Sequence, residues 1–431
     1  MLRMRLFLLC LFTSVCLCLP VAAQAAGLTV DANSVLGDIS PYTLGINYGP
    51  WSLVSPEMLP LAAQSGVTHV RFPAGRWGDV NNVTEQQLDL YMLQVRSWNA
   101  APSVSVRLEG GTPEAAAALV RYANIERDYN VRDWSIGNEP DLYENYSIEQ
   151  FNAEWRAIAL AMRAVDPTIR LIGPEVSQFP ATAAATPYLN ERREWVRQFL
   201  EANGDLVDVV SVHRYPFPRV NGVATTLEQL RADAAEWDML VENLRAVIRE
   251  TLGRDLPIAL TEVNSHWNPV TGGAATPDSF FQAIWWADVL GRLMRQQVEI
   301  VNYFMISSHG NLGGFGILDR YAVRPTYYVY QLYRQLGTQL LASSSSAEYV
   351  TITAARREDG ALTLMVVNRG DDEARLPLHI SDAGMPSPAE VWRLDADHNA
   401  ERSGTLTLAD GDLVVLPAQS VTLYIIADAA E

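Results

Sequence analysis

Two glutamates stand at the ends of apolar segments that lie far apart in the sequence. Glu139 belongs to the Gly-Asn-Glu-Pro sequence that follows Asp133–Ile136, and Glu262 directly follows Pro257–Thr261. A pair of carboxyl groups can cleave a glycosidic bond, because one protonates the leaving oxygen while the other attacks the anomeric carbon or activates water. A separation of about 5 Å makes such a reaction retaining and a wider gap makes it inverting. These residues alone therefore leave the stereochemistry open.

The elements that must position the two glutamates form a regular alternation from Tyr42 to about Gly337. Eight apolar segments are predicted strands: Leu44–Asn47, Thr68–Phe72, Ser103–Arg107, Asp133–Ile136, Arg170–Gly173, Val207–His213, Pro257–Thr261 and Glu299–Phe304. Amphipathic helical segments follow them, with Leu227–Thr251 as the longest. Eight such pairs, with no glycine-rich dinucleotide turn after the first strand, predict an α/β fold of the (β/α)8 TIM-barrel type rather than a doubly wound sheet. Because catalytic groups lie at the carboxyl ends of barrel strands, we expect Glu139 and Glu262 to face each other.

The residue pattern changes after the serines at 343–346. Short segments with period-two alternation, rich in Val, Thr and Leu and separated by turn residues, predict a C-terminal antiparallel β-sandwich domain. We expect the early strand within residues 26–41 to join this sandwich, the barrel to occupy residues 42–338, and the sandwich to occupy residues 339–431.

The first 25 residues have the pattern of a removable signal peptide. Arg3 and Arg5 precede an apolar stretch, Leu6–Leu19, and Ala23-Gln24-Ala25 offers small residues for cleavage. The apolar stretch is short for a membrane span. We therefore expect a secreted or periplasmic protein with no membrane contact after removal of the signal.

Composition excludes several other chemistries. The three cysteines lie inside the predicted signal, and all 32 basic residues are arginines. A mature chain without cysteine or lysine has no disulfide framework, thiolate nucleophile, zinc–sulfur site, Schiff base or P-loop. The formal net charge of −18 disfavours nucleic acid and anionic membranes as partners. We expect a carbohydrate substrate and neither a cofactor nor a metal site; the oligomeric state stays open.

Polar and aromatic residues at other strand ends are further candidates for the site. Arg71, His213 and Tyr215 end predicted strands two and six, and Asn47, Glu109 and Glu175 end strands one, three and five. An arginine and hydroxyl donors around Glu262 would favour its charged form. Rings that follow strands can stack on sugar faces, where C–H groups meet an aromatic surface: Trp51, Trp77, Trp267 and Phe304. The alternative for these residues is core or rim packing, and for Arg71 a bridge between carboxylates inside the barrel.

The motifs resemble the large superfamily of retaining (β/α)8 glycoside hydrolases of the clan A type. In that superfamily the acid/base follows an asparagine on strand four, the nucleophile ends strand seven, an arginine ends strand two and a His-x-Tyr sequence lies at strand six. The resemblance implies Glu139 as acid/base and Glu262 as nucleophile. It also implies Asn138 as a hydrogen-bond donor to the sugar 2-hydroxyl.

Within the superfamily the resemblance is divided among families 79, 44, 51 and 39. It therefore implies double displacement on a poly- or oligosaccharide by an enzyme of the β-glucuronidase, β-glucanase, xylosidase or arabinofuranosidase type. Tyr303-Phe304 on strand eight departs from the tryptophan that is common there. The alternative interpretation is a non-catalytic glycan-binding surface protein on the same scaffold, against which the presence of both glutamates argues.

Overall fold

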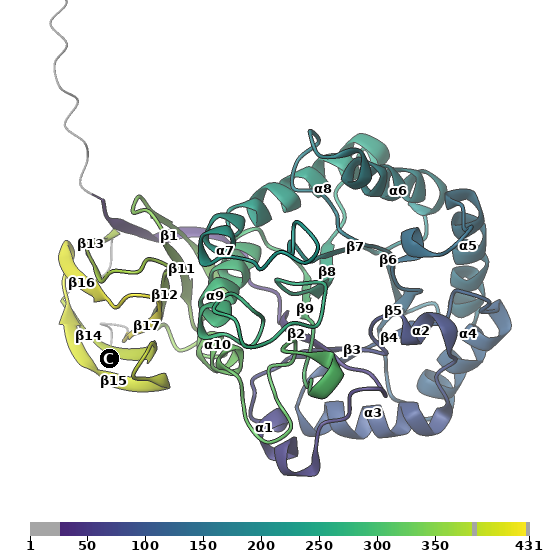
Figure 1. Cartoon of the computed structure of the whole chain (residues 1–431), viewed down its shortest axis with the longest axis horizontal. Helices are drawn as coiled ribbons and strands as arrows, with labels where there is room; N and C mark the ends of the chain where they lie inside the picture. Colours follow the sequence, from purple (N-terminus) through teal and green to yellow (C-terminus); the bar gives the residue numbers. More distant parts are fainter. Residues whose placement is uncertain (1–25, 382–385, 428–431) are drawn as a thin grey trace, which may run out of the picture.

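The computed structural model describes residues 26–381 and 386–427. The predicted signal at residues 1–25 therefore lies outside the described residues. Figure 1 shows a ring of strands and helices with a smaller β-sheet beside it. None of the helices in the described part of the chain combines the length and the apolar composition that a membrane crossing requires.

Eight parallel strands close into a barrel in chain order. They are β2 (Tyr42–Asn47), β3 (His69–Phe72), β4 (Ala101–Val106), β5 (Asp133–Ile136), β6 (Arg170–Val176), β7 (Val209–Arg214), β8 (Ile258–Val263) and β9 (Ile300–Tyr303). All residues of β3, β5, β7, β8 and β9 are buried. This continuous burial follows from the position of parallel strands between barrel interior and helices. The predicted TIM barrel is confirmed.

Helices surround the barrel (Figure 1). They are α1 (Leu59–Ala63), α2 (Trp77–Val80), α3 (Glu85–Ser97), α4 (Pro113–Val120), α5 (Ile148–Val165), α6 (Pro187–Asn203), α7 (Leu227–Asp233), α8 (Glu236–Leu252), α9 (Phe280–Arg295) and α10 (Pro325–Tyr333). Serine or threonine caps α3 to α7 and α9, where each hydroxyl accepts from a backbone N–H of the first turn. The predicted helix Leu227–Thr251 is two helices, because the chain breaks at Ala234 and Ala235, after the buried Asp233.

The second sheet has nine strands in the order β15-β14-β17-β12-β11-β10-β1-β13-β16. They are β1 (Leu28–Asp38), β10 (Gln339–Ser345), β11 (Val350–Arg356), β12 (Leu362–Asn368), β13 (Ala374–Ser381), β14 (Ser387–Leu394), β15 (Asn399–Leu408), β16 (Asp412–Leu416) and β17 (Ser420–Ile426). All pairings are antiparallel except that of β1 with β13. All nine strands contribute side chains to one buried apolar cluster. The predicted antiparallel β-domain is confirmed, and the early strand β1 pairs within it.

The second sheet packs against α9 through a buried ionic contact. Asp288 of α9 accepts from the Thr351 hydroxyl at 2.6 Å and pairs with Arg369 Nε at 2.8 Å. Burial would raise the pKa of Asp288, but Arg369 and Arg292 lower it below its usual value. A charged group without exposure must be paired in this way to be tolerated. The exact division of the chain into residues 26–41, 42–338 and 339–431 stays a prediction.

Candidate active site

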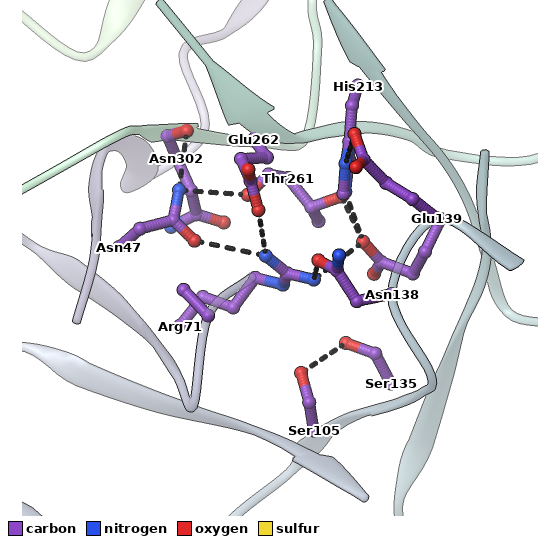
Figure 2. Close-up of polar contacts among 12 residues, drawn as sticks. Asn47, Arg71, Ser105, Ser135, Asn138, Glu139, His213, Thr261, Glu262 and Asn302 are labelled. Carbon is purple, nitrogen blue, oxygen red and sulfur yellow. Dashed lines mark hydrogen bonds and ion pairs between the residues drawn. The ribbon is translucent and has the colours of Figure 1, made fainter. Parts of the chain in front are cut away.

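A cavity of about 720 Å³ opens at the carboxyl ends of the barrel strands. Six of the candidate residues line it: Asn138, Glu139, Tyr215, Glu262, Trp267 and Phe304. Asn47, Arg71 and His213 do not line it and are fully buried. Figure 2 shows how the polar members converge from separate strands. The volume falls in the range of small-molecule sites.

Glu139 reaches the cavity because the chain turns sharply after β5. Gly137 has a φ of 80°, and a Cβ atom there would lie 2.6 Å from the Leu108 side chain. Glu139 itself adopts a left-handed conformation, with φ 47° and ψ 54°. Its backbone N–H donates to the Glu175 carbonyl at 2.9 Å. The turn aims a partly exposed carboxyl group, 22% accessible, into the cavity.

Glu262 lies near the end of β8 and faces Glu139. Its Oε2 atom accepts from Arg71 Nη1 at 3.0 Å, and its Oε1 atom accepts from the Tyr215 hydroxyl at 2.6 Å. One oxygen of Glu262, one oxygen of Glu139 and one ring nitrogen of His213 lie within 4.8 Å of one another. Two carboxyl groups thus meet across a gap of the size that a sugar C1 atom and its leaving oxygen occupy in double displacement.

Arg71 at the end of β3 organises the floor of the site (Figure 2). Besides Glu262, its guanidinium donates to Asn47 Oδ1 at 3.2 Å and to Asn138 Oδ1 at 2.8 Å, and Nη2 lies 3.2 Å from Glu175 Oε2. Burial lowers the pKa of Arg71, but the charges of Glu175 and Glu262 outweigh it and raise the pKa above its usual value. Arg71 is therefore a permanent cation held among two carboxylates and two amides.

His213 bridges two carboxyl groups. Its Nδ1 atom lies 3.1 Å from Glu139 Oε1, and its Nε2 atom lies 2.8 Å from Glu175 Oε2. Burial lowers the pKa of His213, yet the hydrogen bonds to Glu139 and Glu175 raise it to about 10. Burial likewise raises the pKa of Glu175, but Arg71, His213 and Thr261 lower it to about 2. At neutral pH His213 is an imidazolium that donates to both carboxyl groups.

Glu139, His213 and Glu262 lie close enough together to be considered as a metal site. Both ring nitrogens of His213, however, already lie within hydrogen-bonding distance of carboxyl oxygens. A metal would require a neutral imidazole with a free nitrogen. The donor set therefore fits a hydrogen-bond network rather than a cation.

Two amides orient the site in different ways. Asn47 donates to the carbonyl oxygens of Thr261 at 3.1 Å and Asn302 at 3.0 Å while it accepts from Arg71. It therefore ties β2 to β8 and β9 and does not line the cavity. Asn138 uses its oxygen for Arg71, so its NH2 group is the part left to donate toward the cavity that it lines.

Asp79 is a buried site residue that sequence reasoning missed. It lies in the short helix α2, and its Oδ1 atom accepts from the Asn138 N–H at 2.7 Å. Burial raises its pKa to about 8, against hydrogen bonds from Tyr143 and Asn138 that lower it. Asp79 thus fixes the backbone just before Glu139. It follows no strand directly, so the strand-end criterion could not find it.

Aromatic side chains form the walls of the cavity. The Phe304 ring lies 5.8 Å from Trp51, 6.2 Å from Tyr215 and 5.6 Å from Phe315, measured between ring centroids. Trp267 is 46% exposed, and its Nε1 donates to the Pro218 carbonyl at 3.2 Å. Glu109 points elsewhere, into an exposed ion pair with Arg76 at 3.2 Å. The cavity therefore presents carboxyl groups on its floor and ring surfaces on its sides, and Arg76 and Arg219 also line it.

Comparison with known proteins places the chain in a family. Residues 118–373, more than half of the chain, match the model of glycosyl hydrolases family 39, and the chain belongs to this family. The predicted class, a glycoside hydrolase of the (β/α)8 superfamily, is confirmed by this match.

Individual relatives are distant. A β-xylosidase of Geobacillus stearothermophilus is 23% identical over 55% of this chain and 47% of its own length. An intracellular exo-α-(1→5)-L-arabinofuranosidase of Streptomyces lividans is 23% identical over 83% of this chain and 63% of its own. The chain thus spans about half to two thirds of these relatives. The α-L-arabinofuranosidase structure of Thermotoga maritima superposes with a TM-score of 0.76 at 18% identity, covering 93% of this chain and 99% of that one.

The expected secreted or periplasmic location is wrong by this comparison, because the Streptomyces relative is named an intracellular enzyme. The expectation depended on the first 25 residues alone. A chain whose three cysteines all lie within those residues suits a reducing as well as an oxidising compartment, so the remaining residues lent the expectation no independent support.

Proposed function

We propose that the protein cleaves O-glycosidic bonds with retention of configuration, with Glu139 as acid/base and Glu262 as nucleophile. The observation that carries the proposal is the approach of the two carboxyl groups, whose nearest oxygens lie within 4.8 Å across the cavity. Retaining glycosidases hold their carboxyl groups about 5 to 5.5 Å apart, whereas inverting enzymes need room for a water molecule between carboxylate and sugar.

In the first step an oxygen of Glu262 attacks the anomeric carbon and forms an ester bond. The bond from that carbon to the leaving oxygen breaks, and Glu139 gives its proton to the departing oxygen. In the second step Glu139, now a carboxylate, takes a proton from a water molecule whose oxygen attacks the anomeric carbon. The ester bond breaks, and Glu262 leaves as a carboxylate.

The buried charges suit a glutamate that must both lose and regain a proton. Arg71 and His213 carry two positive charges, and Glu175 and the nucleophile Glu262 carry two negative charges, all within one network. Glu139 is joined to this network through His213. His213 Nδ1, 3.1 Å from Glu139 Oε1, acts as a donor that holds the acid/base side chain in place.

Hydrogen bonds to Glu262 would set its reactivity. Tyr215 and Arg71 hold its two oxygens separately, which fixes the plane of the carboxylate toward the cavity. The NH2 group of Asn138 is available to a sugar hydroxyl beside the reacting carbon, in line with the 2-hydroxyl contact that the family resemblance implies. Such a contact contributes most when it strengthens in the transition state.

We propose xylosides or arabinofuranosides as substrates. The names of the Geobacillus and Streptomyces relatives support this sugar class. The net charge of −18 opposes a highly anionic polysaccharide, nucleic acid or an anionic membrane surface as partner. We also propose that the chain divides as the sequence predicts, into an N-terminal strand within residues 26–41, a barrel at 42–338 and a sandwich at 339–431.

A panel of 4-nitrophenyl glycosides tests the function: β-D-xyloside, α-L-arabinofuranoside, β-D-glucoside and β-D-glucuronide. We expect release of nitrophenol from the xyloside or the arabinofuranoside and its loss in Glu262→Gln. Binding of these glycosides and of oligosaccharides without any turnover would contradict the proposal. That outcome would favour the alternative, a glycan-binding surface protein.

A further inference from the structure

A second cavity of about 510 Å³ lies beside the catalytic cavity, between the loops that follow β7 and β8. The first loop contributes residues 218 and 222–225, and the second contributes residues 266, 268 and 270–276. Pro218 lines both cavities. Trp267 lines the catalytic cavity, and its neighbours in the chain, His266 and Asn268, line the second one. The two hollows therefore adjoin along the Pro218–Trp267 contact.

The wall between the two cavities is held in place by backbone pairing. The Phe217 N–H donates to the Ser265 carbonyl at 2.9 Å, and the Trp267 N–H donates to the Phe217 carbonyl at 2.8 Å. The Trp267 indole N–H is fixed on Pro218, which leaves its ring nearly half exposed. The loop after β8 is also held at Val270, whose carbonyl accepts from the Gly314 N–H at 3.1 Å. Backbone hydrogen bonds thus hold both loops that line the second cavity.

Exposed apolar side chains surround this wall. Val220 and Val223 are 62% and 58% exposed, in addition to Trp267. Of these side chains, Trp267 lines the catalytic cavity and Val223 lines the second one. Apolar side chains at these places suit the C–H faces of a sugar.

The lining of the second cavity is polar but uncharged. Among the described residues that line it there is no arginine, aspartate or glutamate, and its hydrogen-bonding side chains are those of Thr225, His266, Asn268, Thr271 and Thr276. Burial lowers the pKa of His266 to about 4, so its ring is neutral near pH 7. Its two nitrogens are shared with Ser265 and Thr225. Uncharged hydroxyl and amide side chains match the hydroxyl groups of a neutral sugar better than they match a carboxylate or phosphate.

We propose that this second cavity is a further carbohydrate subsite. It binds a neutral sugar unit that adjoins the unit held in the catalytic cavity, on the other side of Pro218 and Trp267. The inference deepens the proposed glycosidase function and rests on it. It predicts that the preferred substrate contains at least two neutral sugar units besides any leaving group. A monosaccharide glycoside would occupy the catalytic cavity alone.

Filling the second cavity tests this subsite. Ala274→Trp places an indole in it, and Ala118→Trp places the same side chain on the exposed face of α4 as a matched control. The readout is kcat/KM for 4-nitrophenyl β-D-xyloside against xylotriose, and for 4-nitrophenyl α-L-arabinofuranoside against arabinotriose. We expect Ala274→Trp to lower the trisaccharide value about tenfold more than the nitrophenyl glycoside value, which corresponds to about 1.4 kcal/mol of lost binding. The control should leave this ratio unchanged.

A second, smaller substitution tests the subsite even if the tryptophan variant misfolds. Asn268→Ala removes one amide from the lining and should lower the trisaccharide value alone by about fivefold, the effect of one hydrogen bond. Equal changes for both substrate types, or no change for the trisaccharide, would overturn the subsite while the glycosidase function stands. Absence of turnover of every glycoside by the unaltered protein would instead overturn the proposed function.

Discussion

Nη1 of Arg71 lies 3.0 Å from Oε2 of Glu262, and solvent does not reach the Arg71 side chain. The same guanidinium contacts Glu175 and two asparagine oxygens, so four groups from separate strands depend on one cation. A buried arginine with this many partners holds these four side chains in fixed positions relative to one another. Its loss should affect folding and catalysis together.

Arg71→Met should lower the free energy of unfolding by about 3–5 kcal/mol, because it removes the guanidinium that pairs with the buried Glu175 and Glu262. Urea unfolding at pH 7 measures this loss. Arg197→Met is a matched control, since Arg197 pairs with Glu194 and Glu201 on the surface, and it should leave the free energy of unfolding nearly unchanged. Similar losses in the two variants would contradict the central place of Arg71.

Glu139→Ala should lower kcat by about 10²- to 10⁴-fold for glycosides with poor leaving groups. An activated leaving group departs without a proton. For a glycoside with such a group, the rate of ester formation in the first step should therefore fall less. Azide should restore turnover of such a substrate and yield a glycosyl azide, because a small anion then attacks the ester without a general base. Glu250→Ala, which removes an exposed carboxyl group of α8, is the control. Failure of azide to rescue would remove Glu139 from the acid/base role.

Asp79→Asn should change how stability depends on pH. Burial raises the pKa of Asp79 from 3.8 to about 8 in the folded protein. The unfolded chain therefore loses this proton first, and the free energy of unfolding should fall with rising pH between about 4 and 8, by at most about 1.4 kcal/mol per pH unit. The asparagine of this variant would keep an oxygen for the Asn138 N–H but cannot ionise. Urea unfolding of both proteins at pH 5, 6.5 and 8 measures this difference: the free energy of unfolding should fall less with rising pH in Asp79→Asn than in the unaltered protein. An equal fall in both proteins would contradict the raised pKa of Asp79.

His213→Gln should act in a higher pH window. Hydrogen bonds to Glu139 and Glu175 outweigh burial and raise the pKa of His213 from 6.5 to about 10. Its stabilising effect is complete below pH 6.5 and is lost as pH rises toward 10. The variant should therefore lack the decline in stability that the unaltered protein shows between pH 7 and 10. A decline of equal size in both proteins would mean that His213 is not the group that titrates.

The sequence predicted most of the residues at the strand ends, since β-strands of a barrel deliver their last side chains to one face. Glu139, Glu262, Arg71, His213 and Tyr215 all follow this rule. The rule does not say how deeply a residue is buried. Glu175 was a candidate for the site on the same footing as Glu109, whereas the structure makes it the fully buried partner shared by Arg71, His213 and Thr261.

Other parts of the site depend on contacts between loops that no local pattern encodes. Asp79 reaches Asn138 from a helix of four residues, and Phe217 pairs with the loop of Trp267 through backbone hydrogen bonds. The break of one predicted helix near Asp233 has the same origin, because Asp233 bonds to Arg214 and Trp237 in the folded barrel. Tertiary contacts, rather than residue preferences, decide these features.

The covalent intermediate offers the most direct measurement of the central claim. A 2-deoxy-2-fluoro glycoside of the sugar that the protein hydrolyses, with a dinitrophenyl leaving group, forms the ester quickly and loses it slowly. Mass spectrometry of the intact chain should show one added fluoroglycosyl group, and peptide mapping should locate it on Glu262, with no adduct in Glu262→Gln. No adduct, or an adduct on another residue such as Glu175 or Glu139, would contradict double displacement through Glu262.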